Sequence, residues 1–222
     1  MKHYYYKKIR FTWAVIFAAL ALSLGQISYS ADRTMDTTET LRNTVFNFNE
    51  IEPGFFRSGR LPEESYPELK KLGIKTVVNL IDKEKECCDE LAGLKEYGIQ
   101  TIRIPWNGFD RPKDEDVQKF IEVAKNPQNR PLLVHCKRGA ERTGVMIACW
   151  RIAEKGWTFE QAHEEMKQMK FRWFWYGHLS DYVYEFAKRY GQAGEKSNNI
   201  WRDAKNQTLY FLYKTRKLVP FI

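Results

Sequence analysis

The segment that decides the fold is Leu132-Leu133-Val134-His135-Cys136-Lys137-Arg138-Gly139-Ala140-Glu141-Arg142-Thr143-Gly144. Its opening apolar run predicts a strand that is buried on both faces, as in a parallel sheet. The apolar residues 145–150 that follow predict a buried helix. The short loop between them holds Gly139 and ends at a helix N-terminus, where backbone N–H groups and the helix dipole attract negative charge. The sequence therefore predicts an anion-binding loop.

Two side chains predict the chemistry of this loop. Cys136 lies at its floor, where a helix N-terminus and nearby cations favour the nucleophilic thiolate over the thiol. Arg142 can close over a bound anion with a planar guanidinium whose paired N–H groups match phosphate. A nucleophile and a clamp for a phosphate ester are therefore expected here.

The ten residues His135 to Gly144 (HCKRGAERTG) resemble the active-site signature of the protein tyrosine phosphatase superfamily. The wider chain, residues 46–186, resembles bacterial dual-specificity phosphatases, including those similar to a phosphatase module found fused to NAD kinase. The segments Phe56-Arg57-Ser58-Gly59 and Val77-Val78-Asn79-Leu80 fit this likeness. It implies an α/β fold with a mostly parallel central sheet flanked by helices. The alternative is a buried cysteine in an ordinary strand–loop–helix crossover, which the matching context disfavours.

The resemblance also implies roles for the residues around the nucleophile. Thr143 would assist the sulfur as a leaving group, and His135 would orient the loop. No metal or other cofactor is implied, and the remaining histidines, His3, His163 and His178, are not spaced as metal ligands. The residues expected to contact the substrate are Lys137, Arg138, Gly139, Ala140, Glu141 and Arg142.

The family's general acid is an aspartate on a loop upstream of the nucleophile. The corresponding segment here is residues 106–112, in which Asp110 follows a Phe and closely precedes a Pro. Asp110 is therefore the favoured acid. Asp114 also suits the N-cap of the next helix, but Asp114 and Asp116 stay open as alternatives.

Strands and helices alternate along the chain. Residues 74–80 and 99–104 predict strands, and residues 45–51 predict the opening strand imperfectly. Capping boxes at Ser65–Glu68 and Thr158–Gln161 predict two helix starts. This alternation implies right-handed crossovers, with the loops at the carboxyl ends of the strands gathered around the site.

Residues 1–30 predict a secretory signal peptide, because four Lys and Arg precede an uncharged apolar run that ends in small residues. An uncleaved signal anchor is the alternative. Either implies export, to the periplasm or outside the cell. Without these residues the formal net charge falls from +8 to +4, since they carry four Lys and Arg and no acid. Such mild basicity suits anionic substrates and does not indicate nucleic-acid binding.

The remaining chain is expected to hold a flexible lead-in (residues 31–43), a phosphatase domain (residues 44–191) and a C-terminal extension (residues 192–222). The extension mixes aromatic and basic residues, so it is expected to pack on the domain or, alternatively, to contact a membrane surface peripherally. The aromatic cluster at residues 171–176 predicts core packing, with rings at the site rim as the alternative. A monomer is expected.

Glu141 bears on the substrate, because an acidic side chain at the loop would repel a substrate with many phosphates. Phosphotyrosine and aryl phosphate monoesters are therefore favoured over phosphoinositides and inositol phosphates, which remain the alternative. A phosphate-binding pseudophosphatase is a third reading, disfavoured because Cys136 and Arg142 are both present. Cys87 or Cys88 could trap Cys136 as a reversible disulfide or be ordinary helix residues, and Cys149 suits a buried hydrophobic position.

Overall fold

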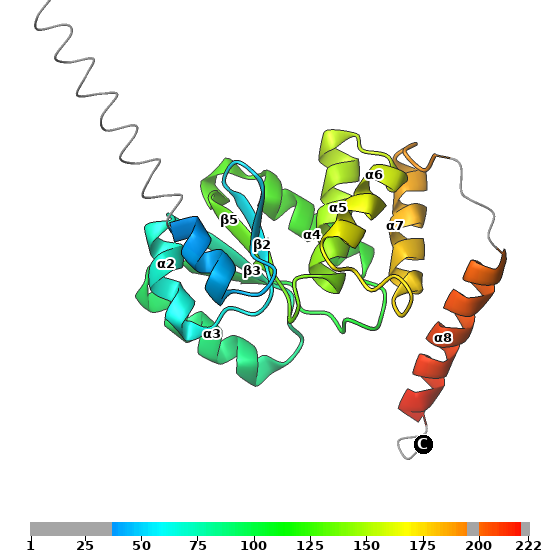
Figure 1. Ribbon diagram of the computed structural model, residues 1–222, viewed down its shortest axis with the longest axis horizontal. Helices are drawn as coiled ribbons and strands as arrows, with labels where there is room; N and C mark the ends of the chain where they lie inside the picture. The colour runs from blue at the N-terminus through cyan, green and yellow to red at the C-terminus, as the bar shows by residue number, and fades with distance from the viewer. Residues whose placement is uncertain (1–36, 195–199, 219–222) are drawn as a thin grey trace, which may run out of the picture. The chain divides into compact units, whose positions relative to one another are not determined.

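The computed structural model describes residues 37–194 and 200–218, and the chain divides into two units, residues 1–40 and 41–222. The second unit contains a five-stranded sheet in the order β1-β2-β5-β3-β4 (Figure 1). The predicted signal peptide or anchor lies outside the described residues. The strands are β1 (Asn49–Glu52), β2 (Phe55–Ser58), β3 (Thr76–Asn79), β4 (Gln100–Arg103) and β5 (Leu132–His135).

The sheet is mostly parallel, as the sequence predicts. Strands β2, β3, β4 and β5 pair in parallel, and β1 is an antiparallel edge strand beside β2. In the central strand β5, His135 pairs with Ser58 on one side and with Asn79 on the other. The ends of β2 and β3 therefore flank the point at which β5 leads into the anion-binding loop.

Helices cover both faces of the sheet. In Figure 1, α2 and α3 lie on one side of it, and α4 and α5 lie on the other, with α6 and α7 beyond them. The helices are α2 (Tyr66–Lys71), α3 (Glu84–Glu96), α4 (Asp114–Lys125), α5 (Glu141–Lys155), α6 (Phe159–Gln168), α7 (Gly177–Arg189) and α8 (Ile200–Leu218), with short 3₁₀ turns at Glu63–Ser65 and Pro127–Asn129.

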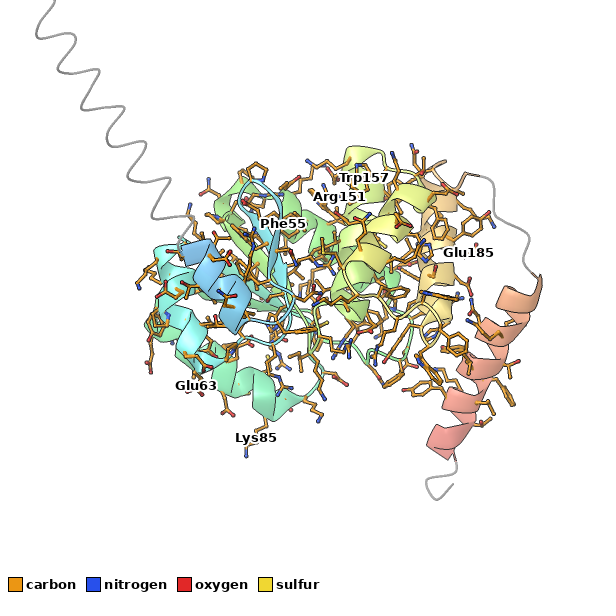
Figure 2. All side chains as sticks on the ribbon, viewed as in Figure 1. Phe55, Glu63, Lys85, Arg151, Trp157 and Glu185 are labelled. Carbon is orange, nitrogen blue, oxygen red and sulfur yellow. The ribbon has the colours of Figure 1, made fainter. Side chains whose placement is uncertain are left out.

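Two hydrophobic cores result, because successive strand residues point to opposite faces. Phe55 and Val134 face the larger core under α4 to α7, and Phe56 and Leu133 face the smaller core under α2 and α3. Helix α5 is buried from its first residue, Glu141, to Ile152, as expected of a central helix. Figure 2 labels Phe55, the residue of β2 that faces the larger core. The loop that joins β5 to α5 is thus anchored at both ends in the protein interior.

Local details of the helix starts depart in part from the prediction. The capping box at Thr158 forms, because Thr158 and Gln161 exchange both bonds. The one expected at Ser65 does not form, since a 3₁₀ turn precedes α2 and Ser65 Oγ donates to the Pro62 carbonyl instead, at 2.6 Å. Asp114 is the first residue of α4 rather than its N-cap, a position that Lys113 occupies.

The flanking segments also differ from expectation. Residues 37–43, which belong to the predicted flexible lead-in, are helical. In the aromatic cluster only the end residues Phe171 and Tyr176 are buried, while Trp173 and Trp175 are exposed, so core packing accounts for only part of it. Across residues 37–194 and 200–218, no helix has both the length and the apolar character that crossing a membrane requires.

Candidate active site

The predicted anion-binding loop (residues 136–142) joins the carboxyl end of β5 to the N-terminus of α5. Cys136 is almost fully buried at its start, and the Gly139 N–H donates to Cys136 Sγ at 3.2 Å. Helix α5 begins at Glu141, and its N-cap residue, Ala140, has no side chain that can accept bonds from the first helix N–H groups. The first N–H groups of that helix are therefore left for an anion, and they add to the positive potential of the helix end.

Gly139 allows the loop to lie directly on the end of β2. Its φ of +66° falls in the left-handed region, which favours glycine. A Cβ at this position would lie 2.4 Å from the carbonyl carbon and oxygen of Ser58, which are backbone atoms that cannot rotate away. The loop conformation thus depends on a glycine at position 139 and on the neighbouring strand.

Arg142 is held by three acceptors from two segments, the loop after β3 and the loop after β4. Its Nη1 donates to the carbonyl of Leu80, the carbonyl of Trp106 and the carboxylate of Asp82, each at 2.9 Å. Since Nη1 makes these bonds, Nη2 and Nε remain as the pair that can bind two oxygens of an anion. Sequence reasoning missed Asp82, although its position just beyond the carboxyl end of β3 is where parallel sheets place ligand contacts.

The loop forms the floor of a cavity of about 570 Å³. Five cationic side chains line it, Lys83, Lys137, Arg138, Arg142 and Arg172, against two acidic ones, Asp82 and Glu141. This excess of positive charge suits a phosphorylated substrate. The other lining residues are Asn107, Gly108, Phe109, Cys136 and Tyr176.

The acidic charge of Glu141 is compensated. Its carboxylate accepts a bond from Arg172 Nε at 2.6 Å and lies 3.8 Å from Arg138 Nε. The sequence argument that Glu141 disfavours substrates with several phosphates therefore loses its physical basis. Arg172 was not predicted as a site residue, because it stands in the aromatic cluster far along the chain.

The side chain of His135, at the end of β5, is held in place by residues of β3 and α3. Its Nε2 lies 2.9 Å from the carboxylate of Glu90 on α3, and Asn79 Nδ2 donates to the same oxygen at 2.7 Å. All three side chains are buried. This arrangement fits the predicted role of His135 in orienting the loop. Glu90 carried no signal in the sequence, since it lies in a segment rich in charged residues.

Thr143 follows Arg142 at the start of α5 and is fully buried. Its Oγ1 has no hydrogen-bond partner among the residues that the structure describes. The hydroxyl is therefore available to a sulfur or phosphate oxygen, and its predicted role in assisting the leaving sulfur stays a prediction.

The Trp106–Pro112 loop forms one wall of the cavity through Gly108 and Phe109. The Phe109 ring stacks between Tyr176 and Tyr213, at centroid distances of 5.3 and 4.9 Å. His178 Nε2 lies 2.9 Å from the Phe109 carbonyl, and burial lowers the pKa of His178 to about 4. The imidazole is therefore neutral at physiological pH and donates to that carbonyl through Nε2–H.

The carboxylate of Asp110 is bound to the C-terminal helix. Its Oδ1 lies 2.9 Å from Lys214 Nζ on α8, and this bond raises the pKa of Lys214. The neighbouring Asn107 donates to the Tyr213 hydroxyl at 2.9 Å. Asp110 thus follows the cavity-lining residue Phe109 without lining the cavity itself, and its side chain is turned to Lys214.

The two alternative acids are placed elsewhere. Asp114 accepts bonds from Arg189 at 2.8 and 3.0 Å and from the Tyr182 hydroxyl at 2.7 Å, and these bonds hold its pKa below the usual range. Asp114 lines a different hollow, and Asp116, like Asp110, is not among the residues that line the Cys136 cavity. An aspartate held as the ionised partner of an arginine is a poor proton donor.

The four cysteines are free thiols. Cys87 is buried on α3, and burial raises the pKa of its thiol, whereas Cys88 is exposed. Cys149 is fully buried on α5, as expected, and burial raises its pKa too. A disulfide between Cys136 and Cys87 or Cys88 stays a prediction, for which the exposed Cys88 is the more reactive partner.

Known proteins match the part of this chain that contains Cys136 and Arg142. The family described as "DSP-PTPase phosphatase fused to NAD+ Kinase" matches residues 35–175. The dual specificity protein phosphatase TpbA of Pseudomonas aeruginosa strain UCBPP-PA14 is 31% identical over 123 residues, which are 55% of this chain and 54% of TpbA. Inositol diphosphatase SIW14 of Saccharomyces cerevisiae is 27% identical over 151 residues, 63% of this chain and 53% of that protein.

The chain thus spans about half the length of these two relatives. Among solved structures, the core catalytic domain of the S. cerevisiae phosphatase SIW14, in complex with citrate, superposes with a TM-score of 0.56 at 25% identity, covering 66% of this chain and 92% of that one. The chain belongs to the family of dual-specificity phosphatases that includes the module fused to NAD kinase, within the protein tyrosine phosphatase superfamily.

Proposed function

We propose that the protein hydrolyses phosphotyrosine and other aryl phosphate monoesters through a cysteinyl-phosphate intermediate. The observation that carries this proposal is the convergence of Cys136 Sγ, the unpartnered start of α5 and the Arg142 guanidinium on one cavity. A relative named as a dual specificity protein phosphatase supports it. No step of this chemistry requires a redox partner.

The reaction has two displacements. In the first, the Cys136 thiolate attacks phosphorus and the bond to the ester oxygen breaks, while Asp110 gives its proton to the departing oxygen. In the second, water attacks the phosphocysteine, the P–S bond breaks, and Asp110 takes the proton from water. Arg142 and the loop N–H groups hold the non-bridging oxygens throughout, and the Thr143 hydroxyl bonds the sulfur as it leaves.

The Asp110→Asn variant tests the general acid. We expect kcat to fall about 10²–10⁴-fold for phosphotyrosine, whose leaving oxygen needs a proton, and far less for an ester of a strongly acidic phenol. Steady-state kinetics over a series of aryl phosphates measures this as a steeper dependence on leaving-group pKa.

Asp114→Asn is the matched control, since it changes an aspartate four residues away that is bound to Arg189. It is expected to keep the wild-type leaving-group dependence. The assignment of Asp110 is wrong if Asp114→Asn or Asp116→Asn steepens that dependence and Asp110→Asn does not.

Inositol phosphates are a second candidate substrate class, favoured by the five cations around the cavity and by the compensated charge of Glu141. The relatives named inositol diphosphatase, SIW14 and DSP4 of Arabidopsis thaliana, point the same way. Purified protein assayed on phosphotyrosine peptides, phosphoinositides, inositol phosphates and inositol diphosphates separates the two classes by kcat/KM. Binding of inorganic phosphate without turnover of any substrate would instead indicate a pseudophosphatase.

We also propose that residues 1–30 export the catalytic domain, because they combine a basic start, an apolar run and a small-residue end. Export predicts that a fusion of these residues to a periplasmic reporter is active and that deleting them leaves the reporter in the cytoplasm. Retention of the exported product in the membrane fraction would identify an uncleaved anchor instead.

A further inference from the structure

Arg57 is a fully buried cation beneath the anion-binding loop. It lies on β2, in the Phe56-Arg57-Ser58-Gly59 segment, with an exposed fraction of 0%. Its Nη2 donates to the Gly139 carbonyl at 2.6 Å. The same carbonyl accepts a second bond from Asn47 Nδ2, at 3.0 Å. The Gly139 carbonyl is thus tied on the side of the loop away from the cavity.

The charge of this guanidinium has little compensation. Its Nε and Nη1 have no hydrogen-bond partner among the described residues. Burial lowers the pKa of Arg57 to about 10, which leaves it charged at neutral pH. A buried charge with no opposite charge bonded to it is unfavourable. The packing of the sheet does not explain why a charged side chain is buried at this position.

Three charged or titratable groups act on Arg57 from the elements around it. Glu165 on α6 favours its charge, but Glu165 is bound to Arg151 on α5, at 2.9 Å. Arg151, labelled beside Trp157 in Figure 2, lies over that ring and opposes the charge of Arg57. The remaining group is Cys136, whose thiolate favours the charged guanidinium.

We propose that Arg57 is a positioning residue of the phosphatase site, which holds the Gly139 carbonyl out of the anion-binding loop and supplies a fixed positive charge to the Cys136 thiolate and the bound phosphate. The phosphate part of this inference rests on the proposed function; the thiolate part does not.

The geometry explains why a buried arginine is suited to both tasks. If the peptide that follows Gly139 turned over, its carbonyl oxygen would face the anion in place of N–H groups. The bond from Arg57 opposes this turn. A guanidinium fixed in the protein interior also acts on nearby charge more strongly than one in bulk solvent, because its position is set before the reaction begins. Arg142 binds the anion from the cavity, and Arg57 acts from beneath the loop.

The reactivity of Cys136 tests the proposal without relying on phosphatase activity. The rate of Cys136 alkylation by iodoacetamide is measured by mass spectrometry as a function of pH, with and without inorganic phosphate. Around Cys136 the other charged or titratable groups are His135, with Glu90 behind it, and the cavity residues Asp82, Lys83, Lys137, Arg138, Glu141, Arg142 and Arg172. None of these is changed in the variants used.

Arg57→Gln retains a donor for the Gly139 carbonyl and removes the charge. We expect it to raise the pH of half-maximal alkylation by about one unit, since a tenfold change in equilibrium corresponds to that shift. Protection by phosphate should weaken about tenfold. Arg57→Lys, which keeps the charge, should stay within about threefold of wild type in alkylation.

Arg130→Gln is the matched control, because it removes a partly buried arginine bound to Glu52 just before the opposite end of β5. A merely structural role predicts lower thermal stability in both Gln variants and an unchanged alkylation profile in both. A folded Arg57→Gln with the wild-type profile and wild-type phosphate protection overturns the proposal. If Arg57→Gln does not fold, Arg57→Lys provides the test. A shift of one pH unit in the alkylation profile of Arg57→Lys would contradict the role of the charge.

These outcomes are distinct from a failure of the proposed function. If the protein hydrolyses no aryl phosphate but Arg57→Gln shows the expected alkylation shift, the proposed function is wrong and the inference about the thiolate stands. If the protein hydrolyses aryl phosphates but Arg57→Gln shows no alkylation shift, the proposed function stands and the inference about Arg57 is wrong.

Discussion

Replacing Cys136 with serine is expected to lower the turnover of aryl phosphates by about 10⁴-fold or more, because a serine hydroxyl in this cavity is not ionised at neutral pH and cannot replace the thiolate nucleophile. Serine is close to cysteine in size, so the loop should keep its fold and its affinity for inorganic phosphate. Steady-state kinetics and phosphate titration measure the two effects separately.

Cys88→Ser is the control for this substitution, since Cys88 is exposed on α3. It is expected to keep wild-type turnover. Appreciable hydrolysis by Cys136→Ser, above the level that contaminating phosphatase explains, would rule out the cysteine mechanism.

The Gly139→Ala variant is expected to lose activity about 100-fold or more and to destabilise the fold by about 2–4 kcal/mol. The added Cβ would overlap the Ser58 backbone at 2.4 Å, so either β2 or the loop has to move. Either movement disturbs the N–H groups that bind the anion. Phosphatase assays and chemical denaturation measure the two losses.

Gly156→Ala provides a matched control. Gly156 ends α5 with a φ of +65°, nearly the same as that of Gly139, and a Cβ there would meet nothing within 4 Å. It should therefore cost only the left-handed strain, about 1–2 kcal/mol, and leave activity unchanged. Equal effects of the two substitutions would contradict the account of the loop resting on β2.

The core of the fold could be predicted because its signals are local. The run Leu132–Val134, the loop with Gly139 and the buried α5 are contiguous in sequence, and each has a period or composition that defines it. The antiparallel pairing of β1 was not predicted, since residues 45–51 alternate imperfectly. Ser65 matches the sequence pattern of an N-cap, but the 3₁₀ turn before α2 directs its hydroxyl to the Pro62 carbonyl instead.

The site was predictable only where its residues are neighbours in sequence. Cys136 and Arg142 share one motif, but Asp82, Glu90 and Arg172 reach it from three other segments. Asp82 and Glu90 stand among other charged residues and Arg172 stands in an aromatic cluster, so neither residue type nor spacing distinguishes them. The contact between Asp110 and Lys214 joins positions far apart in the chain, and no sequence pattern encodes it.

The measurement that tests the central claim most directly is chemical trapping of the intermediate. Protein mixed with an aryl phosphate is quenched in acid within milliseconds, digested and analysed by mass spectrometry, while released phenol is followed in parallel. We expect one phosphoryl group on the Cys136 sulfur, with a burst of phenol that matches the enzyme concentration, and neither in Cys136→Ser. Phenol release without phosphate on Cys136, or phosphate on a different residue, would contradict the mechanism.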